Sequence, residues 1–168
     1  SITQRPKKKK FVFSNYRILG VRALAFLLES RGYKNVTTWN EFNNLKTDSK
    51  GFVVIDGDTK DKELIRNMFN SEKNVYGERI NILLGTKVVS AGVNFHHVRE
   101  VHIMEPQWRD ITQQQVIGRA IRVCSHKLLP RKERTVKSFL YLSSFPAGTA
   151  GMSLDSGKST NQILYELA

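Results

Sequence analysis

Cysteine and long apolar runs are nearly absent from the sequence. Cys124 is the single cysteine in 168 residues, which excludes an internal disulfide bond and fits a reducing compartment. No apolar run approaches the roughly 18 residues that a membrane span needs, so we expect no membrane partner. Residues 1–10 are basic and hold no apolar stretch, unlike a signal peptide. These absences favour an intracellular globular protein.

Acidic residues are scarce relative to basic ones. Lys and Arg total 27 against 15 Asp and Glu, which gives a net charge of +12 and a pI near 10.0. A field of this sign attracts polyanions, of which nucleic acid is the commonest, although many small basic domains bind nothing specific. The hydrophobic content of 40% is typical of a globular domain with its own core.

Short apolar runs alternate with amphipathic stretches. Strands are expected at 11–13, 33–39, 52–55, 80–84, 98–104 and 138–142, and loops at 40–50 and 71–79. Helices are expected at 18–30, from caps within 56–59 to about 69, from Asp110 or Thr112 to about 123, and at 159–167. The alternation predicts an α/β fold with a mostly parallel sheet flanked by helices. Such sheets hold their functional residues in loops at the carboxyl ends of strands.

Two features stand out near the start. The helix expected at 18–30 has an apolar stripe at three-four spacing, which predicts an amphipathic helix. That stripe consists of Leu19, Ala23, Phe26, Leu27 and Ser30. The four lysines at 7–10 are a solvated lead-in, a nuclear address or a phosphate-binding patch.

The helix expected after Asp110 contains the segment Gln-Val-Ile-Gly-Arg-Ala-Ile-Arg, which ends at Arg122. Arg119 and Arg122 are three residues apart and would share a helix face. Two guanidinium groups on one face can grip phosphate oxygens and neutralise charge during phosphoryl transfer. Gly118 would let another backbone approach closely. The alternative is an exposed basic helix whose arginines are incidental.

This segment resembles motif VI of superfamily 2 helicases, and its leading Gln resembles the Swi/Snf-related branch. The following Ser125 and His126 resemble the nucleoside triphosphatase I and early-transcription helicases of poxviruses and other large cytoplasmic DNA viruses. The resemblance implies that Arg122 is an arginine finger and that Arg119 also faces the nucleotide. It further implies that Gln115 links the ATP and nucleic-acid sites.

Residues 84–95 resemble motif V, in which a strand ends in small residues that approach a phosphate chain. The resemblance implies that Thr86, Lys87 and Ser90 contact nucleic acid. Gly92 and Asn94 would face the nucleotide, and many family members have Asp in place of Asn94. An ordinary strand-to-loop turn is the alternative.

Weaker matches fall in the family's order on both sides of these motifs. Residues 11–15 resemble motif IV, which implies that Ser14 and Asn15 lie near the nucleic-acid backbone. The acidic-Pro-x-Trp turn ends at Trp108, which would stack on a base or serve as a buried anchor. Residues 52–59 and the helix after them also match, whereas 33–50 has no counterpart.

The resemblance implies a basic lead-in at 1–10, a RecA-like helicase C-terminal domain at 11–143, and a flexible segment with a truncated helix at 144–168. ATP with Mg2+ would be bound mainly by a preceding RecA-like domain absent from this chain, so the fragment alone should not hydrolyse ATP. The expected partners are that domain, DNA or RNA, and viral transcription machinery in the host cytoplasm or virion. The alternative is a non-catalytic module that binds nucleic acid or a transcription partner; the two intact motif VI arginines argue against it.

Two other patterns are discounted. Residues 156–160 resemble the end of a P-loop, but five residues rather than four separate the two glycines. Neighbouring His96 and His97, with His102, form no zinc pattern beside a single cysteine, so we expect no bound metal.

Overall fold

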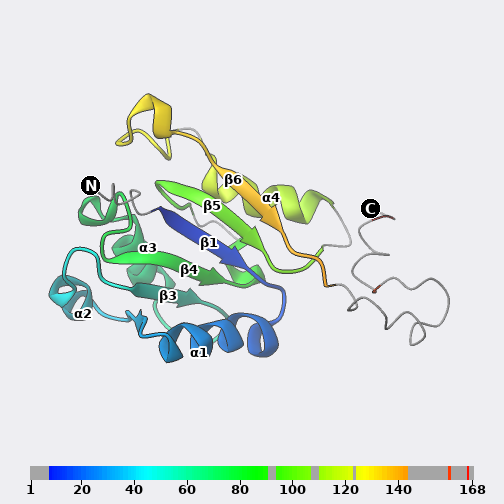
Figure 1. Ribbon diagram of the computed structural model, residues 1–168, viewed down its shortest axis with the longest axis horizontal. Helices are drawn as coiled ribbons and strands as arrows, with labels where there is room; N and C mark the ends of the chain where they lie inside the picture. The colour runs from blue at the N-terminus through cyan, green and yellow to red at the C-terminus, as the bar shows by residue number, and fades with distance from the viewer. Residues whose placement is uncertain are drawn as a thin grey trace, which may run out of the picture.

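The computed structural model describes residues 8–90, 94–106, 110–122 and 124–143, together with Ser159 and Glu166. They form one six-stranded sheet in the order β2-β3-β4-β1-β5-β6, and every pair of neighbouring strands is parallel (Figure 1). The strands are β1 (Lys9–Phe13), β2 (Lys34–Asn35), β3 (Gly51–Ile55), β4 (Ile80–Gly85), β5 (Val98–Ile103) and β6 (Lys137–Leu140). The predicted α/β fold with a largely parallel sheet is confirmed.

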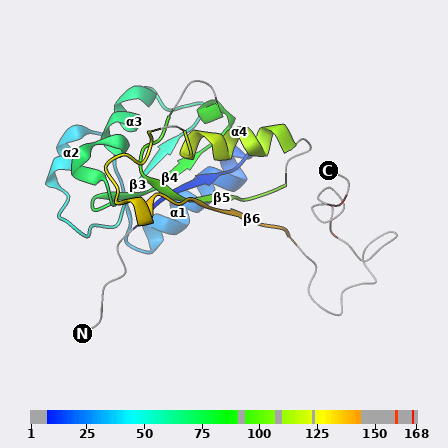
Figure 2. The same ribbon diagram turned by 90° about the horizontal axis from the view of Figure 1, so that it is seen from above.

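Helices cover both faces of the sheet, giving three layers (Figure 2). The α-helices are α1 (Ala23–Ser30), α2 (Trp39–Asn44), α3 (Lys62–Asn70) and α4 (Asp110–Ala120). Helices α2, α3 and α4 pack on one face around a core that includes Phe11, Phe42, Phe69 and Val116. Helix α1 packs on the opposite face against β3 and β4, through a smaller cluster that includes Val21 and Ala25. No described helix is long and apolar enough to cross a membrane.

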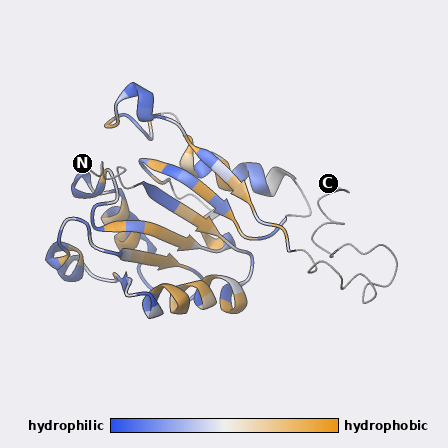
Figure 3. Ribbon diagram, viewed as in Figure 1, coloured by the Kyte–Doolittle hydropathy of each residue, from blue (hydrophilic) through white to orange (hydrophobic). Residues whose placement is uncertain are grey.

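The central strands follow the apolar pattern closely, and β3 and β4 are largely hydrophobic in the colouring of Figure 3. All five residues of β3 are buried, and β4 is buried at five of its six positions. Continuous apolar runs of this kind are typical of strands covered on both faces. The short helical turns are η1 (Arg17–Arg22), η2 (Glu72–Asn74), η3 (Lys87–Ser90) and η4 (Arg131–Glu133).

The stretch expected to be a loop at 40–50 contains a helix instead. The expected strand at 33–39 is reduced to β2, because α2 begins directly after Thr38. The Thr38 hydroxyl accepts a hydrogen bond from the Glu41 amide at 3.2 Å, and the Glu41 carboxylate accepts one from the Thr38 amide at 3.2 Å. This capping box satisfies amides at the helix start and ends the strand.

The expected cap of α3 within 56–59 was also wrong. Asp61 caps this helix by accepting a hydrogen bond from the Leu64 amide at 2.8 Å. Asp56 is buried and accepts a hydrogen bond from Arg22 Nε at 2.7 Å. Although burial opposes ionisation, the hydrogen bonds from Arg22 and Thr59 hold the pKa of Asp56 below its usual value. The turn therefore ties β3 to η1.

The predicted helix at 18–30 exists, but the apolar stripe assigned to it faces solvent. It begins as the π-helical turn η1 and continues as α1. The opposite face, with Val21, Leu24, Ala25 and Leu28, packs on the sheet. Leu19 is 86% exposed and Phe26 is 70% exposed. Because both faces are apolar, helical periodicity could not identify the buried one.

Lys9 is fully buried, so the lysines at 7–10 are not uniformly solvated. Strand β1 begins at Lys9 rather than at Phe11. Lys9 Nζ donates to the Phe69 carbonyl at 2.6 Å and lies 4.1 Å from the centroid of the Phe69 ring. Burial lowers the pKa of Lys9 to about 7, although the charge of Glu78 opposes the change.

Substitution of Lys9 by Met should change how the free energy of unfolding depends on pH. Between pH of about 7 and 10.5 the unfolded chain holds a proton on Lys9 that the folded chain has lost. Wild-type stability should therefore rise with pH in this window, by at most about 1.4 kcal/mol per pH unit from this residue. Urea titrations at pH 7, 8 and 9 measure the effect, and Lys9→Met should remove it. The half-exposed Lys10 provides the control, since equal slopes for Lys9→Met and Lys10→Met would contradict the prediction.

Candidate nucleotide and nucleic-acid sites

The residues predicted to contact nucleic acid gather at the carboxyl ends of the central strands. Ser14 follows β1, and its amide donates to the Gly85 carbonyl at 3.1 Å. Thr86 follows β4, and its amide donates to the Ile55 carbonyl at 3.2 Å. Asn15 and Lys87 lie beside them, and the Lys87 side chain is exposed. The segments that resemble motifs IV and V therefore lie side by side in the fold.

Ser14 and Thr86 are both buried at this edge, whereas the Lys87 side chain is exposed. The Ser14 hydroxyl accepts a hydrogen bond from the Tyr16 amide at 3.1 Å. A Cβ atom at Gly20 would lie 2.0 Å from this hydroxyl, so only glycine allows η1 to pass so closely. Ser14 thus holds the turn after β1 in place.

Glu105 supports the same edge from β5, and motif comparison gave it no chemical role. Its carboxylate accepts a hydrogen bond from the Asn15 amide. Burial raises the pKa of Glu105, while the Asn15 amide, the Ser14 hydroxyl and the charge of Lys87 oppose that change. An acidic side chain therefore orients the backbone between β1 and β5 at this edge.

The arginines of motif VI lie at the opposite, amino-terminal end of the sheet. Helix α4 carries the chain back across the sheet, and Arg119 lies in its last turn. The Phe95 amide, just ahead of β5, donates to the Arg119 carbonyl at 3.3 Å. The expectation that all motifs sit at carboxyl ends was therefore wrong for Arg119, Arg122 and Asn94.

The prediction that Arg119 and Arg122 share a helix face was wrong. Helix α4 ends at Ala120, so Arg122 lies in the following turn and not on the helix. Gln115 and Arg119, four residues apart, do share a face of α4. An added Cβ at Gly118 would meet no atom of the described chain within 4 Å, which leaves this part of α4 open to another surface.

Ser125 and His126 fix the turn that contains Arg122. The Ser125 amide donates to the Arg122 carbonyl at 3.0 Å. His126 Nε2 lies 2.6 Å from the Val98 carbonyl, which can only accept, so the ring donates there. His126 Nδ1 lies 2.8 Å from the Ser125 hydroxyl. These contacts attach the turn to the start of β5.

A pocket of about 480 Å³ lies beside this turn. Its lining residues are Asn94, His96, Arg122, Cys124, Ser125 and Lys127. Asn70 positions its rim, because its Nδ2 donates to the Asn94 carbonyl at 2.9 Å and its Oδ1 accepts from the His96 amide at 2.8 Å. The Asn94 Oδ1 atom is buried and accepts no hydrogen bond within the described part of the chain. Asn94 and Arg122, 28 positions apart in sequence, thus line one pocket.

The pKa values of His96 and His97, near this pocket, are lowered. Burial, together with the charge of Lys9, lowers the pKa of His97 to about 4. The same two causes lower the pKa of His96. The positive charge on the pocket lining therefore comes from Arg122 and Lys127, which suits an anionic ligand such as a phosphate group.

Some predicted residues lie outside what the structure describes. They are Gly92, Trp108, the side chain of Ser90 and the P-loop-like residues 156–158 and 160. Most of the segment 144–168 also lies outside the described residues.

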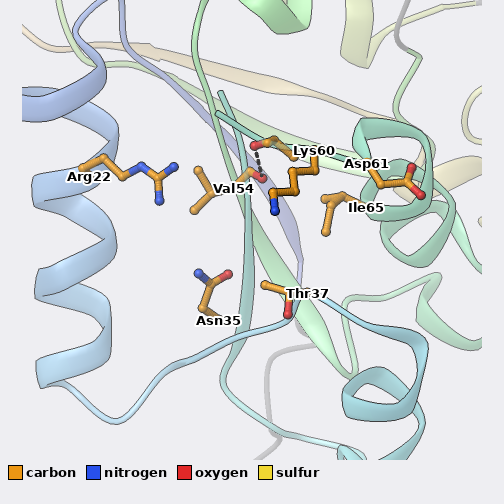
Figure 4. Close-up of a pocket in the computed structure, with 8 residues that line it drawn as sticks. Arg22, Asn35, Thr37, Val54, Lys60, Asp61 and Ile65 are labelled. Carbon is orange, nitrogen blue, oxygen red and sulfur yellow. Dashed lines mark hydrogen bonds between the residues drawn. The ribbon is translucent and has the colours of Figure 1, made fainter. Parts of the chain in front are cut away.

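A second pocket, of about 320 Å³, lies between η1 and α3, and sequence comparison did not identify it (Figure 4). Arg22 and Lys60 point into it from opposite sides, above Asn35 and Thr37. Asp61 also lines it, and Arg22 is already paired with Asp56. The charges here are therefore balanced, unlike those of the pocket beside Arg122.

Comparison with known proteins identifies the family. The model for the helicase conserved C-terminal domain matches residues 2–124. A protein of Acanthamoeba polyphaga mimivirus named as an ATP-dependent RNA helicase is 40% identical over 139 residues, which cover 81% of this chain and 23% of the relative. The chain belongs to the helicase C-terminal domain family.

Further relatives of this helicase C-terminal domain come from other large DNA viruses. The termination factor NPH-I homolog of African swine fever virus is 40% identical over 94 residues, 55% of this chain and 13% of the relative. Helicase 087L of Invertebrate iridescent virus 3 is 32% identical over 169 residues, 94% of this chain and 16% of the relative. The chain thus spans less than a quarter of the length of these curated relatives, and the predicted viral family is confirmed.

The fold of the helicase C-terminal domain also matches a solved structure. The C-terminal part of the Fun30 ATPase domain superimposes with a TM-score of 0.64 over 96% of this chain and 39% of that chain. Sequence identity is 20%, so the match concerns the fold alone. The predicted RecA-like architecture is confirmed.

Proposed function

We propose that this chain is the C-terminal half of an ATP-dependent nucleic-acid helicase or translocase. It supplies arginine fingers to a nucleotide held between two RecA-like halves, together with part of the nucleic-acid track. The observation that supports this most directly is the convergence of Asn94 and Arg122 on one pocket, while Asn15 and Lys87 lie at the opposite end of the sheet.

The pocket beside Arg122 has the chemistry that a nucleotide needs. Arg122 offers a planar fork of donors to phosphate oxygens. Asn94 Oδ1 is an acceptor suited to a ribose hydroxyl. Bound ATP with Mg2+ would supply the phosphoryl group that Arg122 stabilises as charge develops during transfer. Arg119 would also face the nucleotide. Gln115, on the same face of α4, would link the ATP site to the nucleic-acid site. By resemblance, Gly92 belongs to this group.

The nucleic-acid partner would run along the carboxyl end of the sheet. Asn15, Thr86, Lys87 and Ser90 would contact the backbone, with Ser14 supporting the turn from beneath. The names of the relatives include an RNA helicase and a termination factor. These names favour RNA, or the transcription machinery of a large DNA virus, as the binding partner. A viral factory in the host cytoplasm, or the virion, would be the place of action.

The first prediction from the proposed function is that residues 1–168 fold but do not hydrolyse ATP. By family resemblance, the phosphate-binding loop and Mg2+ ligands belong to a preceding RecA-like domain. Circular dichroism should show a folded chain, and a coupled ATPase assay should give no rate above background with or without nucleic acid. An ATPase rate that rises with nucleic acid and persists through repurification would refute the prediction.

The second prediction concerns salt. The stretch 119–137 contains seven cationic side chains and the single acid Glu133. They are Arg119, Arg122, Lys127, Arg131, Lys132, Arg134 and Lys137. Binding should be weak, little dependent on base sequence and steeply salt-dependent, because each neutralised phosphate releases counterions. Anisotropy titrations at 50 and 200 mM salt measure this, and equal affinities would exclude an electrostatic mode.

The third prediction separates Arg122 from the general positive charge. In the longer protein that contains this chain, Arg122→Lys should lower kcat by about 10³-fold, because lysine lacks the planar fork that meets the transition state. The KM for ATP and the affinity for nucleic acid should change far less. Exposed Arg131 is the matched control, and Arg131→Lys should leave kcat intact. Loss of nucleic-acid binding without loss of turnover in Arg122→Lys would favour the non-catalytic module.

A further inference from the structure

Within the described residues, the α1 side of the sheet is covered only in part. Helix α1 packs over β3 and β4, and Figure 1 shows no described helix in front of β5 and β6. The strand register defines the residues on this open face. Lys10, Glu100 and Lys137 form one row across β1, β5 and β6, and Val12, His102 and Phe139 form the next. Tyr141 follows Phe139 by two positions and points to the same side.

Three rings on this face are stacked. The His102 and Phe139 rings are nearly parallel, with centroids 4.9 Å apart and an interplanar angle of 12°. The Tyr141 ring lies 5.9 Å from His102 at 20°, and its hydroxyl lies 2.8 Å from His102 Nδ1. Burial lowers the pKa of His102 and, with Lys10, outweighs the opposing charge of Glu100. Stacking and the contact with the Tyr141 hydroxyl therefore orient the three rings relative to one another.

Phe139 is nevertheless 40% exposed and Tyr141 44% exposed. Aromatic rings in a sheet normally bury their faces against a second layer. Here they form an aromatic platform, defined as His102, Phe139 and Tyr141. Its rigid rings would lose little conformational entropy when a planar ligand stacks on them.

Basic side chains lie in the row next to the aromatic platform. Lys8 and Lys10 lie 3.5 and 3.4 Å from the Glu100 carboxylate, and both lower the pKa of Glu100 despite its partial burial. Lys137 is exposed in the same row. Three lysines against one carboxylate leave the face positive, and the net charge of +12 opposes its use as a contact between two copies of the chain.

We propose that the aromatic platform binds single-stranded nucleic acid, with bases stacked on Phe139 and Tyr141 and the backbone near Lys137 and Lys10. Exposed aromatic rings beside cations on an open sheet face are how several folds bind unpaired bases. A duplex would bind poorly, because its bases already stack on one another.

The platform is continuous with the edge assigned to nucleic acid. The Tyr141 amide donates to the Ile103 carbonyl at 2.9 Å, and the Met104 amide donates to the Phe13 carbonyl at 3.0 Å. The strand could thus pass from the carboxyl edge onto the open face. This inference deepens the proposed function and rests on its nucleic-acid track, but adds a surface that motif comparison does not predict.

The test is fluorescence anisotropy with the 168-residue chain and labelled 12-nucleotide oligo(dT) or oligo(U). Phe139→Ala and Tyr141→Ala should each weaken binding by about 10-fold, and the double variant by more. The slope of affinity against salt should stay unchanged, since no cation is lost. Lys137→Gln should instead reduce that slope. Binding of a duplex of the same length should not respond to the aromatic substitutions.

Matched variants distinguish a loss of stacking from a loss of fold and from a loss of nonspecific hydrophobic binding. Tyr141→Phe keeps the ring and should retain affinity, whereas Tyr141→Leu keeps an apolar side chain and should lose it. Phe26→Ala removes a ring on α1 that is more exposed than either platform ring, and it should have no effect. Thermal denaturation of each variant identifies any loss of fold.

The outcomes distinguish this inference from the proposed function. If the double variant binds oligonucleotides like the wild type while Lys87→Gln weakens binding, the aromatic platform is excluded and the nucleic-acid track stands. If Tyr141→Leu retains full affinity, stacking is likewise excluded. If the wild-type chain binds no single strand at low salt, both proposals fail together.

Discussion

The parallel pairing of every strand is the constraint on which the rest of the structure depends. Parallel neighbours require each connection to return the chain from one end of the sheet to the other, usually through a helix. The return through α4 brings Arg119 and the following turn to the amino-terminal end, beside the start of β5. The residues after β1 and β4 stay at the carboxyl end. Two separated groups of polar side chains are therefore a consequence of the topology, and the motif V segment is the covalent connection between them.

The sequence predicts the interior of this fold better than its surfaces. The runs that became β3 and β4 are apolar at almost every position, and only a strand buried on both faces explains such a pattern. Helix α1 is apolar on two faces, so its periodicity allows either orientation, and packing against the sheet selected Val21 and Ala25. The capping box of α2 could have been identified from the sequence, because Thr38 and Glu41 have the required spacing. The polar composition of 40–50 nevertheless favoured a loop.

The position of Arg122 shows why motif spacing could not give the site's geometry. Spacing places it one turn beyond Arg119 on a continuous helix. The helix instead ends at Ala120, whose carbonyl accepts a hydrogen bond from the Ser125 hydroxyl at 3.3 Å. His126 then anchors the turn to Val98, a partner 28 positions earlier in the chain. Local sequence contains no information on that long-range contact, so spacing could not show that Arg119 lies on the helix and Arg122 in the turn after it.

Electrostatics at the amino-terminal end depends on the burial of two histidines and on a buried lysine beside them. Lys9 lies among Phe69 and the start of β5, where burial and its charge keep His96 and His97 deprotonated. Two histidines that would otherwise titrate near neutrality thus add no charge to the pocket beside Arg122. A guanidinium stays protonated across the physiological range. A bound anion would accordingly meet the charge of Arg122, with Lys127 beside it, rather than charge on His96 or His97.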